Sequence, residues 1–156
     1  MFSTKNLNRS KPYIFLIILF PSLLWILQFI TGNLGVNPIE RIMDEFGLMA
    51  LRLIILTLAI TTLANIKKLK SIVLFRRMIG LFAFYYVTLH FSTYIFLDHF
   101  LDINFILKDI VKRPFITFGF ISFLCLIPLA LTSTNQMVKR LGFKVWKKIH
   151  YLIYPA

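Results

Sequence analysis

One histidine stands inside a long apolar run. The stretch "RRMIGLFAFYYVTLH" (76–90) ends on His90, and the apolar run resumes directly with "FSTYIFL" (91–97). If this run crosses a membrane, the imidazole loses its hydration there, and an ionisable group in that position indicates a functional site. We therefore take His90 as a candidate metal ligand. The alternative is a neutral histidine that is hydrogen-bonded across helices to a hydroxyl group such as that of Thr132.

The other two histidines lie in different surroundings. His150 belongs to "KVWKKIHYLIYPA" (144–156), where a basic stretch passes into an apolar one, and we take it as the second candidate metal ligand. His99 stands in "LDHFLD" (97–102), beyond the apolar run, and we expect it to be a solvated loop histidine.

The composition predicts the elements that must position these side chains. Of the 156 residues 58% are hydrophobic and the mean hydropathy is +0.79, whereas about half of an ordinary globular domain is apolar. Four windows reach the roughly 20 residues that a helix needs to cross a bilayer, and a fifth begins near Trp146. The sequence thus predicts an all-α, polytopic transmembrane helix bundle that forms one domain over residues 1–156. The spans are expected at about 13–31, 47–65, 78–97 and 115–132.

The charged residues alternate between the connections of these spans. The net charge is +12, and basic residues dominate the N-terminal segment and the second and fourth connections, whereas all six acids lie in the first and third. Lysine and arginine stay preferentially on the cytoplasmic side of a membrane, so we predict a cytoplasmic N-terminus. Because topology accounts for the basic residues, no basic groove remains, and we exclude nucleic acid as a partner.

Helix geometry places the two candidate ligands at different depths. A helix that enters the membrane near Met78 brings His90 about 18 Å into a core roughly 30 Å thick, whereas one that starts near Trp146 has risen about 6 Å at His150. At this difference of about 12 Å the two imidazoles cannot hold one iron unless the helices slide by two turns, because each must lie roughly 2 Å from the metal. Either no such iron is bound, or each histidine serves a separate level of the membrane. The last apolar stretch stops about 15 Å into the membrane. We therefore expect a C-terminally truncated chain, in which a partner for His90 would lie beyond Ala156.

Five segments carry a resemblance to a known family. In order they are "GLMALRLIILTLAITTL" (47–63), "RRMIGLFAFYYVTLHFSTYIFLD" (76–98), "DIVKRPFITFGF" (109–120), "IPLALTSTN" (127–135) and "GFKVWKKIHYLIY" (142–154). Together they resemble the MsrQ family, formerly YedZ, of haem-binding membrane subunits of bacterial methionine sulfoxide reductase systems. The similarity runs from about residue 35 to the last residue. It implies a ferric reductase-like transmembrane domain that has six helices in the full-length family.

The resemblance also implies a function. The protein would be a multi-pass subunit of the bacterial inner membrane that carries haem b. Members of the family are also described as binding FMN. The subunit would take electrons from the quinone pool. It would deliver them to MsrP, a periplasmic molybdopterin enzyme that reduces methionine sulfoxide in oxidised proteins. The sulfoxide chemistry would then belong to the partner, and whether this subunit is itself an enzyme stays open.

The family's haem histidines map onto two positions, and two arginines are further candidates. His90 matches the haem histidine of the third helix, and His150 matches the first histidine of the fifth. Arg77 stands 13 residues before His90, where the wider ferric reductase architecture has another histidine. It would bind a haem propionate or an FMN phosphate, or act as an ordinary positive-inside arginine. Arg52, about 6 residues into the second predicted span, would be a propionate partner or an interfacial anchor.

Two rival functions are retained as alternatives. A transporter-like bundle would use polar groups on paired broken helices near the midplane, yet the predicted spans hold no acid and no internal repeat. A non-haem membrane scaffold would keep the same topology without iron. An absorption spectrum separates both alternatives from an electron carrier that holds its iron between imidazoles.

Overall fold

The computed structural model describes residues 4–64 and 71–155, and the regular structure in these residues is helical throughout. Four helices are long and apolar enough to cross a membrane, namely Leu7–Ile30, Pro38–Leu63, Val73–Asp98 and Pro114–Leu131. The predicted all-α polytopic bundle is therefore confirmed. The chain divides into two compact units, Met1–Thr93 and Tyr94–Ala156, which are described separately. Lys67, Lys68 and Lys70 of the basic second connection lie outside the described residues.

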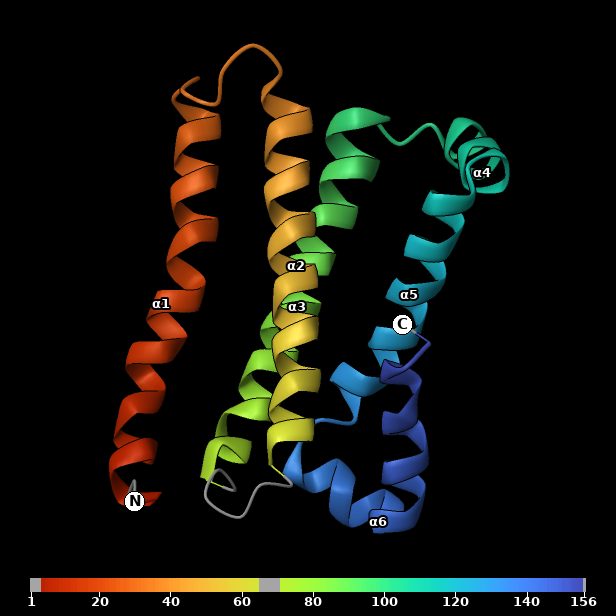
Figure 1. The fold of residues 1–156 in the computed structure, drawn as a ribbon. Coiled ribbons are helices and arrows are strands. Elements are labelled where there is room, and N and C mark those ends of the chain that lie inside the picture. Colours follow the sequence, from red (N-terminus) through yellow and green to blue (C-terminus); the bar gives the residue numbers. More distant parts are fainter. Residues whose placement is uncertain (1–3, 65–70, 156) are drawn as a thin grey trace. The chain divides into compact units, whose positions relative to one another are not determined.

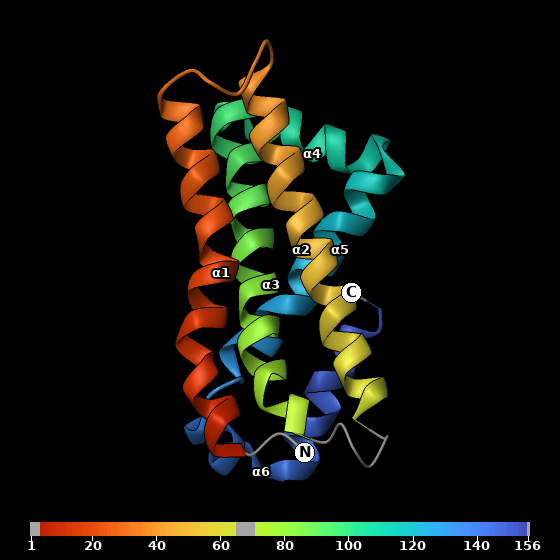
Figure 2. The same ribbon diagram turned by 60° about the vertical axis from the view of Figure 1, so that its left-hand side comes forward.

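The first unit consists of three long helices, α1 (Thr4–Ile30), α2 (Pro38–Leu63) and α3 (Val73–Thr93). The chain reverses between α1 and α2 at Gly32 and Gly35, whose φ angles of 72° and 91° favour glycine. A proline then occupies the start of α2, where its fixed φ suits a helix and its missing N–H costs nothing. Helices α2 and α3 lie side by side along their length (Figures 1 and 2).

Small and aromatic side chains fill the core of the first unit. Ala50 of α2 and Ala83 of α3 are 3% and 2% exposed, and such small residues let two membrane helices approach closely. Tyr86 of α3 is fully buried, and its hydroxyl donates a hydrogen bond of 2.6 Å to the carbonyl of Ile18 in α1. Other core residues are Ile42, Phe46, Leu53, Ile60, Phe75, Ile79 and Phe82.

The second unit is built from shorter helices. A π-helical turn η2 (Tyr94–Asp98) is followed by α4 (Ile103–Lys112), α5 (Pro114–Leu131), α6 (Asn135–His150) and the 3-10 turn η3 (Tyr151–Ile153). Side chains cap two of them: Asp102 accepts a hydrogen bond from the Phe105 N–H, and Thr134 accepts one from the Met137 N–H. Helix α6 is interrupted at Gly142, which has a φ of 73°.

The structure differs from the predicted spans at α2 and α6, and it contains a helix, α4, that was not predicted. Helix α2 begins nine residues before the predicted span, so its first turns contain acids that were placed in a connection. An ion pair of 2.6 Å between Arg41 and Glu45, four residues apart on that helix, stabilises these turns although they are not apolar. Helix α4 was not predicted, because it is amphipathic and too short for a span. Helix α6 was expected from about Trp146; the structure has helical residues from Asn135, interrupted at Gly142, and Trp146 lies in the part after this interruption.

Candidate functional site

His90 lies near the C-terminal end of α3, where its imidazole faces the backbone of α2. Its Nδ1 atom is 2.8 Å from the carbonyl oxygen of Met43, and the side chain is half-buried. A carbonyl oxygen only accepts hydrogen bonds, so Nδ1 carries the proton and donates it. In a neutral imidazole the lone pair then belongs to Nε2, which is the atom that binds a metal when Nδ1 is held in this way.

Gly47 makes this contact possible. A Cβ atom built on Gly47 would lie 3.0 Å from Nδ1 and 3.1 Å from Cε1 of His90, closer than real Cβ atoms normally approach. Gly47 stands four residues after Met43, so the ring rests on the α2 backbone in the same helical turn as the carbonyl that it meets. Gly47 was not among the predicted site residues. The sequence feature that could have indicated it is a glycine inside a predicted helix. Such a glycine costs about 1 kcal/mol of stability relative to alanine and usually has a packing reason.

The alternative partner proposed for His90 makes a different hydrogen bond. The Thr132 hydroxyl donates to the carbonyl of Pro128 at 2.6 Å, within its own helix. The cross-helix hydrogen bond expected of a neutral histidine is present, but it goes to a backbone carbonyl and engages only Nδ1.

His150 is the last residue of α6, and its ring is also held through Nδ1. This nitrogen lies 3.1 Å from the carbonyl oxygen of Trp146, one turn earlier, and therefore donates to it. The imidazole and the Trp146 ring have centroids 4.0 Å apart, and the indole N–H donates to the carbonyl of Thr132 at 3.0 Å. His150 and His90 belong to different units, so their predicted separation in depth stays a prediction.

The two candidate arginines are both exposed. Arg77 lies in the first turns of α3, four residues after Val73. Arg52 lies 14 residues after Pro38, which starts α2, and thus about 21 Å along the helix axis. The prediction that Arg52 lies only about 6 residues into its helix is wrong, because α2 extends further toward its N-terminus than its apolar window does.

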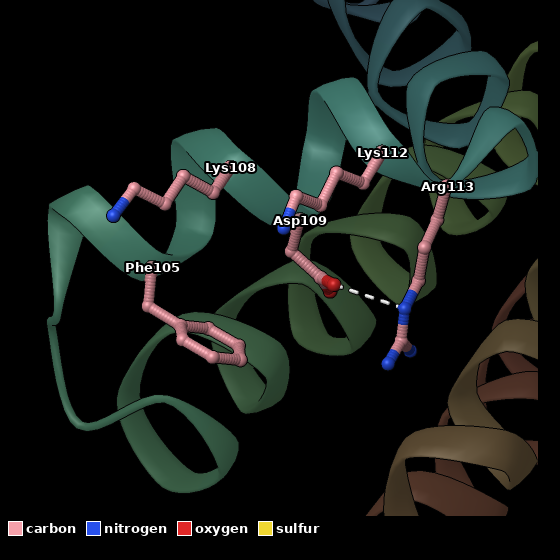
Figure 3. A pocket seen from close by; sticks show the side chains of 5 residues that line it. All are labelled: Phe105, Lys108, Asp109, Lys112 and Arg113. Atoms are coloured by element: carbon pink, nitrogen blue, oxygen red, sulfur yellow. Dashed lines mark ion pairs between the residues drawn. The ribbon is translucent and has the colours of Figure 1, made fainter.

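A charged cluster surrounds Asp109 in the second unit. The carboxylate is buried, with 8% of the side chain exposed, and it accepts a hydrogen bond from the Tyr94 hydroxyl at 3.1 Å. Its other oxygen pairs with Nε of Arg113 at 2.9 Å (Figure 3). Asp109 and Arg113 line a hollow of about 250 Å³ together with Phe105, Lys108 and Lys112. Because ligand pockets usually measure about 300–1,000 Å³, we assign no ligand to this hollow.

His99 belongs to the same cluster. Only 14% of its side chain is exposed, its ring packs edge-on against Tyr94 with centroids 4.4 Å apart, and Nε2 is buried without a hydrogen-bond partner. The nearest carboxylate oxygens, of Asp98 and Asp109, lie 3.4 and 3.9 Å from Nε2. The prediction of a solvated loop histidine is therefore wrong, since the reversal of the chain between η2 and α4 folds the ring inward.

The donor set fits a haem iron better than a metal bound by protein ligands alone. Among the described residues no group of three or more histidine, cysteine, aspartate or glutamate side chains could hold a metal ion. A haem iron needs only axial ligands from the protein, because the porphyrin supplies the other four, and a histidine with Nδ1 hydrogen-bonded is a suitable axial ligand. His90 meets this requirement.

Comparison with known proteins defines the class first. Residues 46–156 match the model of the family described as "Ferric reductase like transmembrane component". This range contains His90, His150, Arg77 and Arg52, and the chain is thus a ferric reductase-like transmembrane protein.

Curated relatives then define the family within this class. The chain is 49% identical over 152 residues to the "Protein-methionine-sulfoxide reductase heme-binding subunit MsrQ" of Herminiimonas arsenicoxydans, with 97% of the chain and 70% of the relative covered. Proteins with the same name from Caulobacter vibrioides and Ralstonia nicotianae are 51% and 41% identical, over 79% and 99% of the chain and 59% and 71% of their own lengths. No solved structure matches. The chain belongs to the MsrQ family.

Proposed function

We propose that this protein is the haem b electron-transfer subunit of a membrane-bound methionine sulfoxide reductase system. His90 and His150 are its iron ligands, each through Nε2. The observation that carries the proposal is the hydrogen bond from Nδ1 of His90 to the Met43 carbonyl, because it leaves Nε2 as the nitrogen with the lone pair. The names of the relatives, which describe them as haem-binding subunits, support the same assignment.

The protein's own residues then have distinct tasks. Bound haem supplies reversible one-electron chemistry, and with imidazole ligands it exchanges electrons without binding a substrate. The Met43 carbonyl orients the His90 ring and raises its basicity as a ligand. Phe46 of α2 and Tyr86 of α3, which are 2% and 0% exposed and have ring centroids 6.2 Å apart, exclude water from between these two helices. Arg77 and Arg52 are proposed to bind propionate carboxylates through bidentate hydrogen bonds.

The direction of electron flow follows from the proposed family role. Electrons would come from the quinone pool and pass to an MsrP-like periplasmic molybdopterin reductase, which repairs oxidised periplasmic proteins. The protein would lie in the bacterial inner membrane with its N-terminus in the cytoplasm, in contact with membrane lipid, as the basic second and fourth connections favour. FMN is retained as a second cofactor through resemblance alone, and we assign no residue to it.

An absorption spectrum tests the haem assignment. The protein, purified in detergent from cells supplied with a haem precursor, should show a Soret band that sharpens and shifts on reduction. His90→Ala should lower the haem content by about one equivalent per protein, because an axial ligand is lost. His99→Ala is the matched control, since His99 is buried among carboxylates and is no proposed ligand, and it should leave the haem content unchanged. A colourless wild-type protein would favour the non-haem scaffold and overturn the proposal. A His90→Ala variant with full haem content would overturn the assignment of His90 as an iron ligand.

A further inference from the structure

We infer that Gly47 and the Met43 carbonyl form a positioning site for the imidazole of His90, which sets the tautomer of this ligand and its strength as a donor to iron. The inference rests on the proposed function, because it concerns how His90 acts as a haem ligand. Its basis is a pair of contacts in one turn of α2: Nδ1 lies 2.8 Å from the Met43 oxygen, and a Cβ on Gly47 would lie 3.0 Å from the same nitrogen.

The ring has to move if position 47 carries a larger residue. The close atoms, Nδ1 and Cε1, belong to the imidazole at the end of the His90 side chain, and a turn of this side chain away from Gly47 also carries Nδ1 away from the Met43 carbonyl. The α2 backbone is also held, because Phe46 and Ala50 on either side of Gly47 are 2% and 3% exposed. An alanine at position 47 therefore has to push the imidazole away from α2, and the hydrogen bond to the Met43 carbonyl lengthens or breaks.

Loss of this hydrogen bond changes the ligand as well as its position. A carbonyl that accepts a hydrogen bond from the Nδ1–H group gives the imidazole partial imidazolate character. This stabilises ferric iron and lowers the midpoint potential of the haem. Without the bond the midpoint potential rises. The affinity for haem also falls, and the loss of a hydrogen-bond partner behind a metal ligand typically costs about 10–100-fold in metal affinity or activity.

Gly80 and Gly119 lie within helices α3 and α5 and provide matched controls. A Cβ on Gly80 would meet the Thr57 methyl group at 3.8 Å, an ordinary van der Waals distance, and a Cβ on Gly119 would meet nothing within 4 Å. Gly80→Ala and Gly119→Ala therefore test what an alanine does to a membrane-spanning helix of this protein without any contact to His90.

The test compares Gly47→Ala with these two controls in the whole haem-loaded protein. We expect Gly47→Ala to show about 10–100-fold weaker haem retention when haem is competed off by an apo-haem scavenger. Its midpoint potential should rise and its low-spin ferric EPR signal should shift, while both controls match the wild type. Equal haem retention, potential and EPR signal in Gly47→Ala and the wild type would overturn the inference. If that result came with loss of haem in His90→Ala, the proposed function would still stand.

A measurement on the unmodified chain covers the case in which Gly47→Ala does not fold. Nitrogen-15 NMR of histidine-labelled, haem-free protein distinguishes the two neutral tautomers, and comparison with His90→Ala identifies the His90 signals. We expect a protonated Nδ1 and an unprotonated Nε2. A His90 signal with the proton on Nε2 would contradict the positioning role, because the Met43 carbonyl could not then accept from Nδ1.

Discussion

At the scale of single residues, polar groups join α1 to α3 inside an apolar interior. Tyr86 donates a hydrogen bond to Ile18 of α1, and the Tyr85 hydroxyl lies 3.2 Å from the hydroxyl of Ser22. Ser22 and Tyr86 are both fully buried. Apolar packing alone gives little drive for association between membrane helices, because lipid is as apolar as the helix, so these contacts help to hold α1 against α3.

Tyr86→Phe tests this role. The substitution keeps the ring but removes the donor to the Ile18 carbonyl, and it should lower the free energy of unfolding by about 1 kcal/mol. The measurement is unfolding of the detergent-solubilised protein by increasing amounts of sodium dodecyl sulfate. Tyr13→Phe is the control, because Tyr13 is 66% exposed and its hydroxyl makes no hydrogen bond within the part of the chain that the structure describes. Equal unfolding curves for the Tyr86→Phe and wild-type proteins would count against the interhelical bond.

At the scale of elements, α4 has two different exposed stripes. Ile103, Leu107 and Val111 follow at intervals of four residues and are 67%, 58% and 81% exposed. Lys108 and Lys112 are also exposed and form a second stripe next to the apolar one. Figure 3 shows both lysines on α4 together with Asp109. Only Arg113 separates α4 from the membrane-spanning helix α5. We therefore expect α4 to lie in the membrane interface, with its apolar stripe toward the acyl chains and its lysines among the phosphates.

Spin labels on the two stripes test this placement. Labels would be attached to Leu107→Cys and to Lys108→Cys after Cys125→Ser has removed the native cysteine. In lipid bilayers the label at position 107 should collide more often with oxygen, which concentrates in lipid, than with a water-soluble nickel complex. The label at position 108 should show the opposite preference. Equal access of the nickel complex to both positions would place α4 in water instead.

At the scale of the whole molecule, the distribution of charge predicts the orientation in the membrane. The turn between α1 and α2 carries no basic residue, whereas the segment that begins at α6 carries five, Lys139, Arg140, Lys144, Lys147 and Lys148. We expect these two regions to lie on opposite sides of the membrane, with the basic one in the cytoplasm.

Labelling of single cysteines in intact spheroplasts checks this orientation. Val36 is fully exposed in the turn between α1 and α2, and Lys139 is exposed on α6. Val36→Cys and Lys139→Cys are made separately in a Cys125→Ser background. A membrane-impermeant maleimide should label position 36 from outside and position 139 only after the membrane is permeabilised. Labelling of position 139 in intact spheroplasts would show that the orientation is reversed.

The class of structure and the main candidate ligand could be predicted from the amino-acid sequence alone. Continuous apolar runs can satisfy their backbone groups in lipid only as helices, so the four spans followed from local composition. A histidine inside such a run is a rare and costly residue, which is why His90 could be selected without a structure. Helix ends were less predictable, because the ion pair of Arg41 with Glu45 extends α2 beyond its apolar window.

The surroundings of His90 and His99 depend on tertiary packing. Met43 and Gly47 lie more than forty residues from His90 along the chain, and their contact with its ring depends on how α2 and α3 are aligned along their axes. No local pattern specifies that alignment, because it results from the packing of all side chains between the two helices. The burial of His99 beside Tyr94 and Asp109 likewise depends on where α4 folds back, so its surroundings could not be predicted from the acidic residues next to it in the sequence.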